Sequence, residues 1–219
     1  MKVKPLLVAS LIAIAAMIAY AFWAAGQLPA GAELPTHWNT AGKADDWMPA
    51  LQALLIAPVL LLFVSILFAF IPRLEPLQDR LEASAPLLRT VWIAMIALTL
   101  FLQGFISAPV FGVEPRSELV LFAVGLLFVV LGNVLPKSRP GFFVGIRTPW
   151  TIVSTDNWIA THRLGGKCFM AGGALMMLAG LGDWGEGTRI ALVFGAIAIA
   201  ALIPLGYSWW LWHTGRATA

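Results

Sequence analysis

The sequence predicts an all-α integral membrane protein, a polytopic bundle of about six transmembrane helices with both termini on the cytoplasmic side. Three observations support this prediction. The 219 residues are 60% hydrophobic and only 11% charged, whereas a soluble domain carries roughly 25% charged residues and could not bury so much apolar surface in one core. Long uncharged stretches separate the charged residues, and Lys and Arg are distributed unevenly among the connecting segments.

Five uncharged stretches are long enough to cross a bilayer, which takes about 20 residues of helix. Counted between consecutive charged residues, they contain 28 residues after Lys4, 26 after Asp46, 24 after Arg89, 18 after Glu118 and 26 after Arg189. The first is longer than the apolar region of a signal peptide, about 7–15 residues. We therefore expect a retained anchor, although Ala19-Tyr20-Ala21 resembles a cleavage site whose use would leave five spans.

The sixth stretch is short, with 15 residues between Lys167 and Asp183, or about 22 Å of helix. Starting the helix at Leu164, with Lys167 snorkelling toward the headgroups, gives nearly a full crossing. A re-entrant segment is the alternative. Gly173 and Gly180 lie seven residues apart on one helical face, where small residues allow close packing of helices.

The basic residues predict the orientation. With the N-terminus inside, the inner segments hold 11 Lys and Arg residues and the outer segments hold 3, as the positive-inside rule requires. The inner connection 73–89 is charged, and its prolines are expected to break the helices: Pro72, Pro76 and Pro86. Segments 109–118 and 183–189 are predicted to be short outer turns.

Several function classes find little support. The net charge of +3 includes no basic stripe that could follow a nucleic acid backbone, so no direct nucleic-acid binding is expected. No catalytic residues, cofactor or metal site are predicted, because each histidine is alone and no nucleophile–base set or phosphate loop occurs. A small-solute transporter or channel is the alternative function, with Pro58 and Pro204 breaking helices around a substrate; a membrane-embedded enzyme is less favoured.

The outer loop, residues 27–49, is the first candidate site. Its Asn, Gly, Pro and Asp residues favour a compact loop, and Trp38 and Trp47 suit interfacial anchoring. His37 with Asp45 and Asp46 indicates either a pH-sensitive or cation-binding site or a plain polar turn. The candidate residues of this outer-loop site are Pro35, His37, Trp38, Asn39, Gly42 and Asp45.

The inner loop, residues 137–166, is the second candidate site, too apolar for a free linker and too interrupted to span. Ser154 or Thr155 is suited to cap a short interfacial helix over 155–164, with Trp158, Thr161 and His162 along one side, followed by a bend at Gly165-Gly166. Exposed basic residues here suit lipid phosphate or an acidic partner, or are ordinary positive-inside charge; they are Arg147, His162 and Arg163.

These two loops resemble a known family. Gly145-Ile146-Arg147-Thr148-Pro149-Trp150-Thr151, then Trp158 and Thr161-His162-Arg163-Leu164-Gly165-Gly166, with Leu131-Gly132-Asn133 upstream, is similar to the signature of the SdpI family. The segment from Leu34 to Asp45 resembles a domain of unknown function common at the N-terminus of such proteins. Gly141 departs from the pattern, because the family usually has Asn there.

The resemblance implies a multi-pass protein of the bacterial inner membrane with three parts: a two-helix unit over 1–72, an inner loop and third helix over 73–108, and an SdpI-like region over 109–219. It also implies a non-enzymatic immunity protein or signal receptor, whose partners are the bilayer, a membrane-active peptide toxin outside and a cytoplasmic repressor inside. The inner-loop site residues implied are Asn133, Gly145, Arg147, Thr148, Pro149, Trp150, Trp158, Thr161, His162, Arg163, Gly165 and Gly166.

Overall fold

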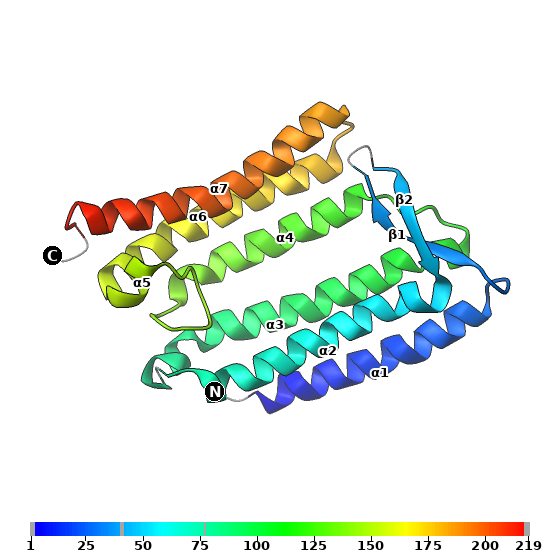
Figure 1. Ribbon diagram of the computed structural model, residues 1–219, viewed down its shortest axis with the longest axis horizontal. Helices are drawn as coiled ribbons and strands as arrows, with labels where there is room; N and C mark the ends of the chain where they lie inside the picture. The colour runs from blue at the N-terminus through cyan, green and yellow to red at the C-terminus, as the bar shows by residue number, and fades with distance from the viewer. Residues whose placement is uncertain (1–2, 40–41, 77, 217–219) are drawn as a thin grey trace. The chain divides into compact units, whose positions relative to one another are not determined.

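The computed structural model describes residues 3–39, 42–76 and 78–216. Six long helices in these ranges are long and apolar enough to cross a membrane (Figure 1): α1 (Lys4–Gly26), α2 (Ala50–Leu74), α3 (Gln78–Ile106), α4 (Glu118–Val134), α6 (Thr155–Leu181) and α7 (Glu186–His213). Shorter elements connect them: strands β1 (Glu33–Trp38) and β2 (Ala44–Pro49), the short helix α5 (Pro149–Val153), and the 3-10 helices η1 (Ala108–Phe111) and η2 (Leu135–Lys137). The all-α polytopic fold class is confirmed.

The helices divide into two compact units, which we describe separately. The hairpin unit comprises residues 3–69 and 92–120, without the gap at 40–41. Its core joins α1, β1, α2 and the end of α3, and small residues such as Ala21, Ala24 and Ala53 let the helix backbones approach one another closely. Leu34 of β1 is 1% exposed in the same core, so the hairpin rests on the ends of these helices.

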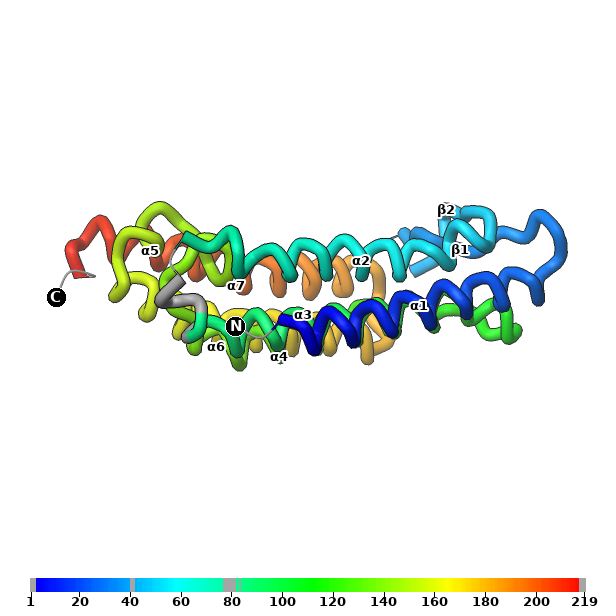
Figure 2. Tube along the Cα trace, turned by 90° about the horizontal axis from the view of Figure 1, so that it is seen from below, coloured from blue at the N-terminus to red at the C-terminus, as the bar shows by residue number. Residues whose placement is uncertain are grey.

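The loop unit comprises residues 70–91 and 121–216, apart from the undescribed residue 77. In this unit α6 packs along α7, and α5 lies beside both helices (Figures 1 and 2). Helices α4 and α6 meet at glycines: a Cβ on Gly125 would lie 2.6 Å from the carbonyl oxygen of Gly173, and one on Gly132 would lie 2.6 Å from that of Gly166. Backbone contact of this kind is typical of membrane helix pairs.

Helix α6 corrects two expectations about the inner loop. It runs unbroken from Thr155 to Leu181, so the separate interfacial helix over 155–164 and the bend at Gly165-Gly166 are wrong. These glycines do not bend the chain because each provides room for a neighbour: Gly165 for the Ile146 side chain and Gly166 for the Gly132 carbonyl. The 27-residue helix is long enough for a full fifth crossing, which also removes the re-entrant alternative.

Pro76 lies in the connection between α2 and α3, as expected of a helix breaker, but the other prolines expected to break helices lie within them. Pro72 is inside α2, Pro86 is inside α3, and Pro204 is inside α7, so the inner connection is much shorter than 73–89. Proline removes one backbone hydrogen bond, and membrane helices tolerate this where neighbours satisfy the freed groups. Pro58 likewise lies within α2, so neither it nor Pro204 separates two half-helices.

The outer loop forms an antiparallel hairpin, which the sequence analysis did not predict. Strand β1 pairs with β2 from Glu33 opposite Pro49 to Trp38 opposite Ala44, with register irregularities around His37. The Ala50 backbone N–H donates to the Ala32 carbonyl at 2.9 Å, which ties the start of α2 to the hairpin. The hairpin is a two-stranded addition to an otherwise helical fold.

Candidate functional sites

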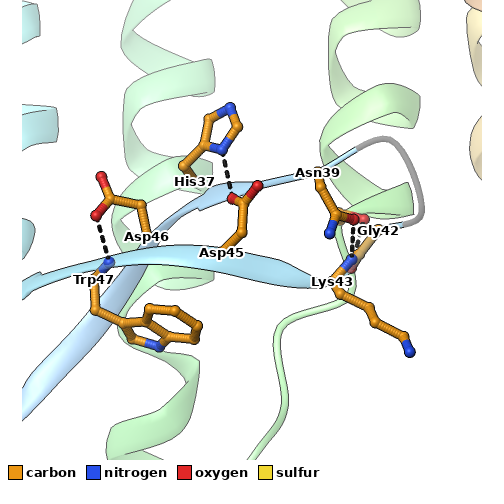
Figure 3. A network of polar contacts seen from close by, with 8 residues as sticks. His37, Asn39, Gly42, Lys43, Asp45, Asp46 and Trp47 are labelled. Carbon is orange, nitrogen blue, oxygen red and sulfur yellow. Dashed lines mark hydrogen bonds and ion pairs between the residues drawn. The ribbon is translucent and has the colours of Figure 1, made fainter.

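The exposed pair of His37 and Asp45 is the main polar feature of the hairpin. His37 Nδ1 lies 2.6 Å from Asp45 Oδ1, with side-chain exposures of 67% and 41% (Figure 3). Asp46 does not join them, because its Oδ1 accepts a hydrogen bond from the Trp47 backbone N–H at 3.0 Å. In the described ranges no three His, Cys, Asp or Glu side chains gather to hold a metal ion.

The remaining candidate residues of the outer loop stabilise the hairpin turn, pack in the interior or are exposed. The Asn39 side-chain oxygen accepts from the Lys43 backbone N–H at 3.1 Å, and Gly42 has a φ of 81°, a value that favours glycine. Trp38 packs against Phe105 of α3 with ring centroids 4.9 Å apart, so it belongs to the protein interior more than to an interfacial belt. Trp47 is 49% exposed, and Pro35 is buried.

A buried Trp–His pair forms the centre of the inner loop. Trp158 and His162 are one helical turn apart, both 0% exposed, with their rings stacked at 4.1 Å. The Ile146 backbone N–H donates to His162 Nε2 at 2.8 Å, and Nδ1 lies 2.8 Å from the Trp158 carbonyl oxygen. A carbonyl can only accept, so Nδ1 carries the proton, Nε2 carries the lone pair, and the ring is neutral.

Gly145 is the contact point between the loop and this pair. Its φ is +121°, and a Cβ there would lie 2.5 Å from His162 Nε2 and 2.6 Å from a Trp158 ring carbon. Only a residue without a side chain fits both the backbone conformation and the space. The next residue, Ile146, is thereby positioned to donate to His162, which explains why a glycine precedes it.

A buried hydrogen-bond network joins α5, α6 and α7 next to this pair. Thr148 caps α5: its hydroxyl accepts from the Thr151 backbone N–H at 3.1 Å, and the Thr151 hydroxyl accepts in return from the Thr148 N–H at 2.9 Å. The Ser208 hydroxyl of α7 lies 3.3 Å from that of Thr148. Asn157 donates to the Ser208 carbonyl at 2.9 Å and accepts from Thr161 at 3.0 Å. The network is fully paired and holds the three helices in one arrangement.

Two residues beyond the signature anchor the loop: Glu75 in the connection between α2 and α3, and Ser84 in the first part of α3. The Glu75 carboxylate, 4% exposed, accepts from the backbone N–H groups of Phe142 at 3.0 Å and Phe143 at 3.3 Å. The Ser84 hydroxyl accepts from the Arg139 N–H at 2.9 Å and donates to the Arg139 carbonyl at 3.2 Å. Arg147 donates to the Phe142 carbonyl. The first part of the loop is therefore held by Glu75 and Ser84.

The structure separates the inner candidate residues into two groups. The buried group makes the framework just described: Thr148, Trp158, Thr161, His162, Gly165 and Gly166. The exposed group consists of Asn133, Arg147, Pro149 and Arg163, with Trp150 half-buried. The basic cluster expected from Arg147, His162 and Arg163 is wrong in one member, because His162 is buried and neutral.

Sequence reasoning missed several residues of this framework: Glu75, Ser84, Ser138, Asn157 and Ser208. The Ser138 hydroxyl accepts from Trp158 Nε1 at 3.2 Å. Asn157 and Ser208 carry a usable signal, since polar residues at helix positions in a membrane chain usually find a partner. Glu75 and Ser84 carry none, because they lie in a segment that reads as an ordinary charged connection.

Comparison with known proteins finds matches that contain both loops. The SdpI/YfhL protein family matches residues 137–208, and the domain of unknown function DUF1648 matches residues 12–62. The chain is 22% identical to the Immunity protein SdpI of Bacillus subtilis (strain 168) over 181 residues, which cover 80% of this chain and 83% of that protein. No solved structure matches this chain. The signature loop therefore lies inside a region, residues 137–208, that matches the SdpI/YfhL family, and the six apolar helices make the chain a multi-pass protein of the cell membrane.

Proposed function

We propose that this chain is an immunity protein that protects a bacterial cell from a membrane-active peptide arriving from outside. The observation that carries the proposal is its similarity to an immunity protein over 80% of the chain, together with family matches that contain both loops. The hairpin supports it, because a rigid element with exposed His37, Asp45 and Trp47 is suited to meet a peptide at the membrane surface. The chain itself would intercept the peptide.

The proposal requires the hairpin to face outward. In the hairpin unit the connection between α1 and α2 lies beside the connection between α3 and α4, since the Ser117 hydroxyl donates to the Gly42 carbonyl at 3.4 Å. In the loop unit Glu75, between α2 and α3, and Ser84, in the first part of α3, both contact the connection between α4 and α6. Helices that cross the membrane alternately give this pairing, and the excess of Lys and Arg supports an inward-facing position for the inner loop. Lys2, one of the basic residues counted on the inner side, lies outside the residues that the structure describes.

We further propose that the inner end binds a cytoplasmic protein such as a repressor. The framework around His162 holds exposed cations at Arg147 and Arg163 beside exposed apolar side chains, Phe142 at 41% and Val153 at 69%. Mixed basic and apolar surface on a rigid base suits a protein partner. Pull-down of cytoplasmic proteins by the wild type, weakened by Arg147→Ala with Arg163→Ala, would support this; equal recovery would count against it.

Challenge of living cells tests the immunity proposal. A sensitive strain expressing the chain and an empty-vector strain are exposed to a panel of membrane-active peptides, with membrane levels of the protein measured in parallel. At least a ten-fold rise in the inhibitory concentration of one peptide is expected. Equal sensitivity to every peptide, with the protein present in the membrane, would overturn the proposal.

Cysteine labelling tests the orientation. In a Cys168→Ala background, Lys43→Cys and Arg163→Cys each place one thiol at an exposed position of the hairpin or of α6. A membrane-impermeant maleimide applied to intact cells should label only Lys43→Cys, and both variants should react after the membrane is opened. Labelling of Arg163→Cys alone in intact cells would reverse the topology.

A further inference from the structure

The side chain of Gln103 is one of the buried polar groups that the described part of the chain leaves unpaired. It lies in the last turn of α3, is 5% exposed, and neither its amide nitrogen nor its amide oxygen has a hydrogen-bond partner in the described part of the chain. A primary amide brings two donor hydrogens and an accepting oxygen. Leaving all of them unpaired inside a membrane bundle is costly, and neither the fold nor the inner-loop framework explains it.

Gln103 belongs to a polar line along one face of α3, and its neighbours on that line are all paired. Trp92, Thr99, Gln103 and Ser107 follow at intervals of seven, four and four residues, and each is almost fully buried. Trp92 Nε1 donates to the Ser10 hydroxyl at 2.8 Å, Thr99 donates to the Met95 carbonyl at 2.9 Å, and Ser107 accepts from the Tyr20 hydroxyl at 2.8 Å. The chain thus supplies partners at every position on this line except one.

The unpaired position lies next to the hairpin. Phe105 and Ile106, the second and third residues after Gln103, share a core with Leu34 of β1. Trp38 packs on the Phe105 ring at 4.9 Å. Gln103 therefore lies at the end of the hairpin unit where the proposed function places contact with the peptide.

We infer that the Gln103 amide is a binding determinant for the membrane-active peptide: its oxygen accepts from free backbone N–H groups, or its NH2 donates to free backbone C=O groups, at whichever end of the inserted peptide it meets. The inference rests on the proposed function and deepens it, by naming an interior group that the peptide contacts. The first four N–H groups and the last four C=O groups of a helix lack internal partners, so a peptide terminus presents backbone groups that complement a primary amide.

The gain on binding is the difference in hydrogen bonding of Gln103 between the free protein and the complex. In the free protein the amide has no partner among the described residues, so binding of the peptide breaks no hydrogen bond of Gln103. In the complex the amide gains partners in surroundings of low dielectric constant, where a hydrogen bond is stronger than in water. The peptide terminus also escapes an unpaired position in the hydrocarbon layer. Both the Gln103 amide and the peptide terminus therefore gain hydrogen-bond partners on binding.

Gln103→Met tests the inference, because methionine is unbranched and of similar length but lacks the amide. Removing an unpaired buried polar group should raise the Tm of the detergent-purified chain by about 2 °C or more, while protection falls at least ten-fold. The probe is the challenge-panel peptide against which wild-type cells gain most. A gain in stability combined with loss of protection is the result that a merely structural role would not produce.

Two control variants separate this role from general effects on the unit. Thr99→Val removes a hydroxyl one turn away that is already paired within its own helix. Ser65→Ala removes a second unpaired buried polar group from the described residues of the unit, about 22 Å along α2 from its hairpin end. Both should keep wild-type protection, and Ser65→Ala should also be at least as stable as the wild type.

The outcomes separate the inference from the function beneath it. Wild-type protection that survives unchanged in Gln103→Met overturns the inference and leaves the immunity proposal standing. Loss of protection in Gln103→Met and equally in both controls also overturns it, because the effect then belongs to the whole unit. Absence of protection by the wild type itself overturns both. Loss confined to Gln103→Met, with the protein present at wild-type levels, supports the inference.

Discussion

Gly145→Ala is the most severe single change that the inner loop offers, although it adds only one methyl group. The added carbon would lie 2.5 Å from His162 Nε2 and 2.6 Å from the Trp158 ring, and the residue would keep a φ of +121°. His162 and Trp158 cannot move away, because both are fully buried and hydrogen-bonded. The loop must therefore shift, and the bond from the Ile146 N–H to His162 is lost with it.

The magnitude follows from two separate costs. A non-glycine residue in a sparsely populated positive-φ conformation costs about 1–3 kcal/mol. Overpacking a close-packed site by one carbon costs about 1–3 kcal/mol more. The free energy of unfolding should therefore fall by roughly 2–6 kcal/mol, or a Tm decrease of roughly 4–20 °C for a chain of this size.

Thermal unfolding of the purified protein in detergent measures this change. Gly195→Ala in α7 is the matched control, because a Cβ there meets nothing within 4 Å and alanine in a helix is favoured over glycine by about 0.5–1 kcal/mol. The control should keep or raise the Tm. The reasoning would be refuted by a Gly145→Ala protein as stable as the Gly195→Ala protein.

Three further predictions follow from other contacts. Gly132→Ala should lower the stability by about 1–3 kcal/mol, because its Cβ would lie 2.6 Å from the Gly166 carbonyl; an unchanged Tm would contradict the close α4–α6 contact. Glu75→Ala should speed tryptic cleavage after Lys137 and Arg147 about ten-fold, since bonds to a carboxylate contribute about 1.5–3 kcal/mol. The exposed control Glu114→Ala should be cleaved at the wild-type rate, and equal rates for the two variants would refute the role of Glu75 as an anchor. His37→Ala should change the stability by less than about 1 kcal/mol, because the pair with Asp45 is exposed. A fall in the protection of cells by this variant would therefore report on recognition of the peptide. A large decrease in Tm would show instead that the pair is structural.

The sequence sufficed for the helices because span length and hydrophobicity are local properties. The stretches after Lys4, Asp46, Arg89, Glu118 and Arg189 all became long apolar helices. Trp158 and His162 were correctly expected on one side of a helix, because residues four apart share a face. The match to the family signature also identified Gly145 and Gly166 before any contact was known.

The remaining features depend on partners distant in the sequence, and no local pattern carries them. Gly165-Gly166 looks like a bend until the neighbouring Ile146 and Gly132 are in place. Pro86 looks like a helix breaker, because tolerance of proline is decided by the surrounding bundle. The hairpin pairs a strand containing Pro35 with one containing Asp45, residue types that are depleted in strands. Glu75 becomes an anchor only because two backbone N–H groups from residues almost seventy positions later reach it.

The central claim, that the chain itself intercepts a membrane-active peptide, is tested most directly without cells. Purified wild-type protein is reconstituted into liposomes that contain a fluorescent dye, and the peptide against which it protects cells is added outside. The account predicts that dye release falls as the ratio of protein to lipid rises, and that Gln103→Met liposomes leak more than wild-type liposomes. Leakage equal to that of protein-free liposomes at every ratio would contradict it, because protection would then require another component of the cell.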